Sequence, residues 1–229
     1  MKVLVLFSGG LDSTTALAMA IDRYGKENVI ALSISYGQKH TKEIEAAKKI
    51  VRHYQIEHLY LDLAKIFAYS DCSLLQHSDN QIPHGSYNEQ LTKIAGTPVS
   101  TYVPFRNGLF LSSAASIAIS KNCDIIYYGA HSDDAAGSAY PDCSEVFNNA
   151  MNQAIYEGSN HQLKIMAPFV KMTKADIVKI GLSLGVPYEL TWSCYEGNEH
   201  PCGTCGTCID RQNAFLKNGI KDPLLGEQK

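Results

Sequence analysis

The sequence predicts an α/β fold, with a doubly wound, mostly parallel sheet that carries helices on both faces. Two observations lead to this prediction. Short apolar runs rich in Val and Ile alternate along the chain with longer segments of helical periodicity, and this alternation is typical of a parallel sheet. The composition, 45% hydrophobic and 19% charged, provides for a buried core in a chain of 229 residues.

The first part of the chain predicts three strands and two helices. Its apolar runs are short and suit strands that are buried on both faces. Gly25 is placed to end the first helix, and Thr41 is placed to cap the second. In order, we expect a strand from Val3 to Phe7, a helix from Asp12 to Tyr24, a strand from Val29 to Ser35, a helix from Thr41 to Tyr54 and a strand from Glu57 to Asp62.

A long polar excursion from Ala64 to Thr101 follows, and we interpret it as part of a substrate lid. The pattern of alternating helices and strands then resumes. Thr173 and Asp176 indicate a capping box at the start of the last helix of this pattern. In order, we expect a helix from Asn107 to Ser120, a strand from Asp124 to Gly129, a helix from Cys143 to Tyr156, a strand from Gln162 to Ala167 and a helix from Thr173 to Leu184.

Charge and hydropathy exclude several classes of protein. A net charge of -3 does not favour a large nucleic-acid partner, because such partners usually select a basic face. No apolar run is long enough to span a bilayer. The N-terminal segment MKVLVLFSGG is interrupted by glycines too early for a signal peptide. We therefore expect a cytoplasmic protein, with no membrane partner.

The first chemical motif is Ser8-Gly9-Gly10-Leu11-Asp12-Ser13-Thr14-Thr15, at the predicted junction of the first strand and the first helix. Ligands usually bind at this edge of a parallel sheet. The two glycines can turn successive N–H groups inward, and the hydroxyl groups add donors, so the motif predicts a phosphate cradle. Asp12 would repel phosphate unless a cation lies between them, and we assign it to magnesium. A plain glycine turn with a capping serine is the alternative, but the strand before the motif and the helix after it favour phosphate binding.

The second motif is Cys194-x7-Cys202-x2-Cys205-x2-Cys208, with Gly203 and Gly206 between the last three cysteines. Four thiolates at this spacing favour a closed, structural zinc site, although an iron–sulfur cluster can also use four cysteines. The remaining cysteines are scattered, and the odd total of 7 argues against a disulfide framework. We expect one domain over residues 1–190, and a zinc knuckle with a C-terminal helix packed on it over residues 191–229.

The string SGGLDS resembles the loop of the pyrophosphatase-loop family of ATP enzymes. The resemblance implies a Rossmann-like fold of the adenine nucleotide alpha hydrolase type, and adenylation of a substrate oxygen with release of pyrophosphate. It differs from the Walker loop, because it lacks the Lys and its glycines are adjacent. The residues implied to contact ATP are Phe7, Ser8, Gly9, Gly10, Leu11, Asp12, Ser13, Thr14, Thr15, Ala16 and Leu17.

The two motifs together resemble the 7-cyano-7-deazaguanine synthase family over nearly the whole chain. Further matching segments are Tyr36-Gly37-Gln38 with His40 and Glu43, Val103-Pro104-Phe105-Arg106-Asn107, Gly129 with Asp133, Tyr140-Pro141-Asp142-Cys143 with Phe147, Pro168-Phe169, Lys174 to Ile177, Trp192-Ser193-Cys194, and Arg211 with Ala214 and Phe215. Leu11 stands where many members carry Gln, which puts no phosphate contact in doubt.

This resemblance implies a ligase of queuosine biosynthesis that acts on 7-carboxy-7-deazaguanine, a small purine-like carboxylate. ATP would adenylate the carboxylate, ammonia would displace AMP to form an amide, and a second ATP would activate the amide oxygen to leave a nitrile. No segment of domain size remains for a glutamine amidotransferase, so we expect ammonia itself as the nitrogen donor. ATP, Mg²⁺ and Zn²⁺ are the implied cofactors.

Several side chains outside the two motifs are candidates for the active site. Arg106, at a helix start, suits a substrate carboxylate or phosphate as well as a solvated surface. Lys174 begins another helix and could either cap it or meet the β and γ phosphates. One of Asp133, Asp134 and Asp142 is expected to accept the N–H pair of a guanine-like edge. Of the eight histidines, His131 is the active-site candidate because it adjoins this acidic block.

Two other classes of function remain open at this point. A tRNA-modifying member of the same superfamily, of the thiolation or lysidine type, usually carries an RNA-binding appendage or a basic surface, and the acidic balance argues against it. A non-catalytic zinc module with an inactive loop is disfavoured by the intact Asp12. The sequence leaves open whether the chain forms a homodimer, which base acts on ammonia, and which host it comes from.

Overall fold

The computed structural model, which describes residues 1–93, 98–135 and 139–225, confirms the doubly wound α/β fold. One sheet has the strand order β3-β2-β1-β4-β5, and every pairing in it is parallel. The strands are β1 (Val3–Leu6), β2 (Val29–Ser35), β3 (Glu57–Asp62), β4 (Ile125–Tyr127) and β5 (Lys164–Met166).

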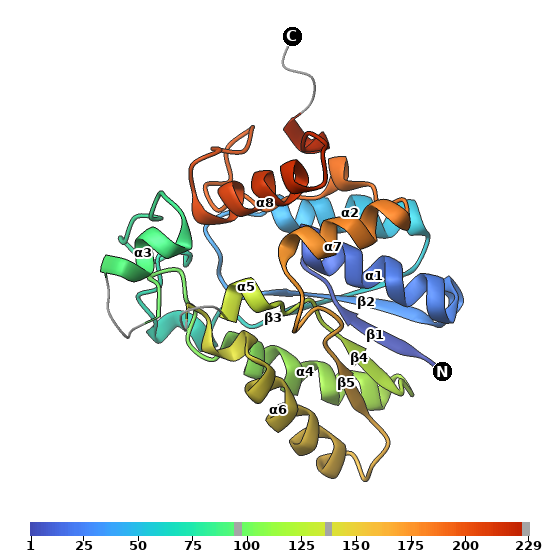
Figure 1. The fold of residues 1–229 in the computed structure, drawn as a ribbon. Helices are drawn as coiled ribbons and strands as arrows, with labels where there is room; N and C mark the ends of the chain where they lie inside the picture. The colour runs from blue at the N-terminus through green and yellow to red at the C-terminus, as the bar shows by residue number, and fades with distance from the viewer. Residues whose placement is uncertain (94–97, 136–138, 226–229) are drawn as a thin grey trace.

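Helices cover both faces of this sheet (Figure 1). On one face lie α1, α2 and α7, and on the other lie α4 and α6. The described helices are α1 (Leu11–Tyr24), α2 (Lys42–Tyr54), α3 (Tyr87–Lys93), α4 (Arg106–Ser120), α5 (Ser132–Ala135), α6 (Glu145–Gly158), α7 (Lys174–Ser183) and α8 (Gly206–Lys217). In the described part of the chain, none of them is long and apolar enough to cross a membrane.

Alternation along the strands explains the two faces. In β1, Leu4 packs into a core with α4, whereas Val3 and Val5 pack into a second core with α1 and α2. All three side chains are fully buried, with 0% exposure. A strand buried on both faces has no polar position, which is why the sequence shows a continuous apolar run at this point.

The predicted elements agree closely with the observed ones, and the differences have local causes. The helix predicted from Cys143 begins at Glu145, because Ser144 caps it by accepting a hydrogen bond from Phe147 N at 3.2 Å. Residues Pro141–Cys143 form a separate 3-10 turn. The capping box of Thr173 and Asp176 is confirmed at the start of α7. The short helix α5 was not predicted, since its four residues are too few to show a period.

The polar excursion contains α3 and packs against the four-cysteine segment. Gly85 N donates to Thr204 O at 2.9 Å, and His84 Nδ1 lies 2.6 Å from Thr204 Oγ1. Two parts of the chain that are distant in sequence are thereby joined beside the carboxyl ends of the strands. The helix α8 in turn lies along α7, on the α1 and α2 side of the sheet (Figure 1).

Candidate active site and metal centre

A cleft opens where the strand order reverses, at the carboxyl ends of β1 and β4. The chain leaves β1 toward α1 on one face and leaves β4 toward α6 on the other, so a crevice remains between them. Gly129 lies at its floor, where an added Cβ would be 3.2 Å from Asp12 C and from Ser13 N. The cleft is lined by residues of both predicted motifs and by α2, α3 and α4.

Gly9 allows the loop after β1 to turn beneath α2. Its φ is +86°, and a Cβ there would lie 2.5 Å from Ala47 N and from Glu43 O, so only glycine fits. Gly10 differs from our expectation, because its φ of -80° is open to any residue. It has a different reason to be small, since a Cβ would lie 3.2 Å from Ser8 Oγ and would narrow the cleft.

The hydroxyl groups of the loop divide into two sets. Ser8 and Ser13 line the cleft, with their Oγ atoms 3.1 Å apart. Thr14 is fully buried, and its Oγ1 donates to Gly10 O at 2.7 Å. Thr15 is also buried, and its Oγ1 lies 2.8 Å from Tyr188 Oη. The other two residues at this end of the predicted ATP segment are Ala16 and Leu17, which pack in the core below the loop.

Asp12 is the centre of a charged group in the cleft. Its Oδ2 lies 3.6 Å from Lys174 Nζ and 3.7 Å from His131 Nε2. Its Oδ1 is buried, and no described residue hydrogen-bonds to it. A buried carboxylate oxygen without a donor suits a bound cation, so the residues fit magnesium. The structure thus brings Asp12 and Lys174 together as one site.

Among the described residues, the lining of this cleft does not include Asp133 and Asp142, each of which accepts a hydrogen bond from a backbone N–H group. Asp133 Oδ2 accepts from Lys174 N at 2.8 Å, at the start of α7. Asp142 is buried, and its Oδ2 accepts from Asn107 N at 2.9 Å, at the start of α4. Both carboxylates therefore position the helices that carry Lys174 and Arg106. The side chain of Asp134 lies outside the described part of the structure.

Arg106 lines the cleft beside two aromatic rings. Its guanidinium carbon lies 5.2 Å from the centre of the Tyr36 ring and 5.9 Å from that of Phe110. Phe105, immediately before it, has a φ of +54°, an uncommon conformation for a bulky residue. Cation–π contacts with both rings and a hydrogen bond with the Tyr36 hydroxyl hold the guanidinium in place, and a planar guanidinium with five N–H donors suits an anionic ligand.

Glu43 is an acidic residue of this cleft for which the sequence predicted no role in the site. It lies in the first turn of α2 and lines the cleft. Burial raises the pKa of its carboxyl group to about 7, and the charge of Arg106 opposes this shift. Glu43 follows the second strand, and residues that follow parallel strands gather at one edge of the sheet. This position was the signal that could have identified it.

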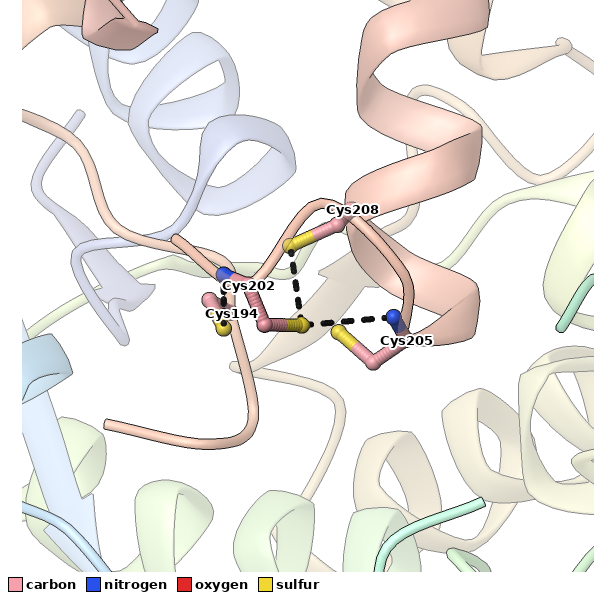
Figure 2. A group of neighbouring side chains, drawn as sticks. All are labelled: Cys194, Cys202, Cys205 and Cys208. Atoms are coloured by element: carbon pink, nitrogen blue, oxygen red, sulfur yellow. Dashed lines mark hydrogen bonds between the residues drawn. The ribbon is translucent and has the colours of Figure 1, made fainter. Parts of the chain in front are cut away.

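The four cysteines converge as predicted (Figure 2). Their Sγ atoms all lie within 4.8 Å of one another, and the side chains point toward a common centre. Backbone N–H groups of Cys202 and Cys205 donate to Cys194 Sγ and Cys202 Sγ, both at 3.3 Å. Hydrogen bonding with the thiols of Cys205 and Cys208 lowers the pKa of Cys194. This is a four-cysteine metal site, closed on all sides by its own ligands.

The metal site also shapes the cleft. Trp192, Ser193 and Tyr195, which flank the first cysteine, line it, and Thr207 lines it from α8. Arg211 anchors this segment, because its Nη1 donates to Thr191 Oγ1 at 2.7 Å and to Ser193 Oγ at 3.3 Å. Residues next to the predicted metal site therefore line the same cleft as the predicted ATP loop. The division into domains at residue 190 stays a prediction.

Comparison with known proteins finds similar sequences over nearly the full length of this chain. Residues 2–219 match the family model described as queuosine biosynthesis protein QueC. The 7-cyano-7-deazaguanine synthase of Archaeoglobus fulgidus is 44% identical, over 100% of this chain and 92% of the relative. That of Caldicellulosiruptor saccharolyticus is 43% identical, over 98% of this chain and 95% of the relative.

A solved structure shows a similar fold at low identity. The NMN synthetase of Francisella tularensis matches with a TM-score of 0.53 and 14% identity, over 96% of this chain and 78% of that one. At this identity the likeness concerns the fold alone, and the full-length matches to the synthases carry the functional comparison.

Proposed function

We infer the reaction from the family, because the chain belongs to the family of the queuosine biosynthesis protein QueC. It acts as an ATP-dependent ligase, a 7-cyano-7-deazaguanine synthase of queuosine biosynthesis. The tRNA-modifying alternative is thereby set aside. The substrates that we propose are 7-carboxy-7-deazaguanine, ammonia and two molecules of ATP, with two AMP and two pyrophosphate as co-products.

The chemistry requires activation of a poor electrophile twice. A carboxylate oxygen attacks the α phosphorus of ATP, pyrophosphate leaves, and the acyl-adenylate can then accept ammonia with loss of AMP. The amide oxygen is adenylated in the same way, and loss of AMP and of both protons on the nitrogen leaves the nitrile. One site can perform both rounds, because acid and amide differ only at the reacting carbon.

One observation carries the proposal: the phosphate loop and a fixed cationic side chain open into the same cleft. Gly10, Asp12 and Arg106 all line it. We propose that ATP lies along the loop, with its phosphates over the N-terminus of α1, whose dipole favours anions. The substrate carboxylate then lies between the α phosphate and the Arg106 guanidinium, which suits a planar anion.

Lys174 and magnesium are assigned to the leaving group. The Lys174 ammonium is buried beside Asp12 and is held there by the start of α7, where its charge can offset that of the departing pyrophosphate. Magnesium, held by Asp12, would neutralise phosphate charge when bound. Ser8 and Ser13 add hydroxyl donors along the same wall.

We further propose zinc as the metal of the four-cysteine site. Four sulfur ligands in a closed arrangement are the usual set for structural zinc. The site leaves no open position for a substrate, so its role is to hold the segment from Trp192 to Thr207 against the cleft.

The test is a complete reaction with the purified chain, 7-carboxy-7-deazaguanine, ATP, Mg²⁺ and ammonium chloride. We expect the nitrile, with two AMP released for each, and an accumulation of amide when ATP is limiting. Recovery of the acid unchanged would contradict the substrate assignment. Appearance of ADP and phosphate in place of AMP would contradict the adenylate mechanism.

A further inference from the structure

We propose that Glu43 is the base that removes a proton from ammonium before ammonia attacks the adenylated carboxyl group. The inference rests on the proposed function and assigns a role that the function requires. Ammonia is mostly protonated at neutral pH, and ammonium has no lone pair with which to attack. A ligase that uses free ammonia therefore gains from a proton acceptor inside its cleft.

Glu43 has the right position for this role, because α2 packs directly on the phosphate loop. Its backbone O is one of the two atoms that a Cβ on Gly9 would meet at 2.5 Å. Glu43 lines the cleft that Gly10, Asp12 and Arg106 also line, and its carboxyl group interacts electrostatically with Arg106. A carboxylate is thus present in the compartment where the acyl-adenylate would form.

The other acidic candidates have different partners. Asp133 and Asp142 each accept a backbone N–H, from Lys174 and Asn107 respectively. Asp12 faces Lys174 and suits the metal ion. Among the described residues that line the cleft, the acidic side chains are Asp12 and Glu43. Glu43 is therefore the carboxylate that remains for proton transfer.

The electrostatic setting agrees with this role. Burial raises the pKa of Glu43 to about 7, and the positive charge of Arg106 on α4 opposes that rise. The hydroxyl of Tyr36, after β2, also interacts electrostatically with Glu43. A carboxylate of this pKa accepts a proton from ammonium more readily than one of ordinary pKa and still releases it to water near neutral pH.

The step balances as follows. Ammonium transfers one proton to a Glu43 carboxylate oxygen and becomes ammonia. The nitrogen lone pair forms the C–N bond, the bond from the carbonyl carbon to the AMP oxygen breaks, and AMP leaves with that electron pair. The acylated nitrogen sheds its surplus proton to water, and Glu43 returns its own proton to water through the open cleft.

The experiment compares Glu43→Gln with Glu45→Gln, an exposed glutamate of the same helix, in the full-length zinc-loaded enzyme. Acid-dependent exchange of labelled pyrophosphate into ATP reports adenylation alone, and amide plus nitrile reports nitrogen transfer. In E43Q we expect exchange within about 3-fold of wild type and transfer from ammonium lowered by about 10²–10⁴-fold near pH 7, the usual range for a lost general base. E45Q should match wild type in both assays.

Hydroxylamine separates a base from a substrate-binding group, because it is largely unprotonated at neutral pH. If Glu43 acts as the base, E43Q should form the hydroxamate at nearly the wild-type rate. The rate of E43Q with ammonium should also rise with pH in proportion to free ammonia. Glu43→Asp, which keeps a carboxylate, should restore part of the ammonium reaction and provides a second variant if E43Q folds poorly.

Three results would overturn the inference. Equal losses with ammonium and hydroxylamine, with a raised KM for the acid, would make Glu43 a group that binds the purine-like edge. E43Q indistinguishable from E45Q in an active enzyme would refute the role of Glu43 and leave the proposed function intact. Failure of the wild type itself to form amide or nitrile would refute the proposed function, and the role of Glu43 with it.

Discussion

The carboxylate of Asp12 lies 3.6 Å from the ammonium of Lys174, Oδ2 to Nζ. One residue belongs to α1 and the other to α7, which are far apart in the sequence, and the two helices pack side by side on one face of the sheet. Lys174 is buried, so its charge needs the carboxylate as a partner. The pair lines the cleft in which we propose that the phosphates of ATP bind.

Replacement of Asp12 by Asn should abolish adenylation and leave the fold intact. The amide removes the charge that would hold magnesium, and we expect AMP formation to fall by at least about 10³-fold, at the upper end of single electrostatic contacts. AMP release, measured against magnesium concentration, tests this. Asp22→Asn, an exposed position of the same helix, is the control and should be fully active. Near-wild-type AMP formation by D12N would refute the magnesium role.

Lys174→Met should slow adenylation more than it weakens ATP binding. The ammonium is expected to stabilise charge that develops on the leaving pyrophosphate, so kcat should fall by about 10²-fold or more. Lys179→Met, an exposed lysine of α7, serves as the matched control. A rise in KM for ATP with unchanged kcat would instead assign Lys174 to ground-state binding.

Gly9→Ala and Gly10→Ala should differ sharply in stability. Alanine at Gly9 would have a φ of +86° and a Cβ 2.5 Å from two backbone atoms of α2, so we expect a loss of about 2 kcal/mol or more. Gly10 has a permitted φ of -80°, and its variant should fold nearly normally while ATP binding weakens. Urea unfolding of both variants measures this difference, and equal stabilities would contradict the proposed packing of α2 on the loop.

Elemental analysis should find one zinc per chain, bound by the four cysteines. Cys202→Ser should lose the metal and lower the melting temperature, because a structural metal contributes directly to folding. Cys123→Ala, at a buried cysteine outside the site, should keep the zinc. Iron with sulfide, or no metal in the wild type, would refute the assignment.

The stability of the chain should depend on pH through Glu43. Its pKa is raised from 4.5 to about 7 by burial, so between these values the folded chain binds more protons than the unfolded chain. The free energy of unfolding that Glu43 contributes is therefore fully present below pH 4.5 and is lost as pH rises toward 7. We expect E43Q to gain stability relative to wild type over this interval, measured by urea unfolding. A constant difference would contradict the raised pKa.

The sequence alone determined the fold class, the phosphate loop and the four-cysteine site, because each has a local signature. Continuous apolar runs require strands buried on both faces, as β1 confirms. The string SGGLDS between a strand and a helix and the spacing of Cys202, Cys205 and Cys208 are both visible along the chain. Capping residues such as Thr173 are equally local, and the predicted start of α7 was correct for this reason.

The tertiary structure alone decided which distant side chains share the cleft. Asp133 and Asp142 have the chemistry of a purine-binding carboxylate, yet each is hydrogen-bonded to a backbone amide of another segment. In the sequence, Glu43 has the features of an ordinary glutamate in the first turn of a helix. The packing of α2 on the loop places it in the cleft. Burial and the distances between charges depend on how whole elements pack, and that information is not contained in any short stretch of sequence.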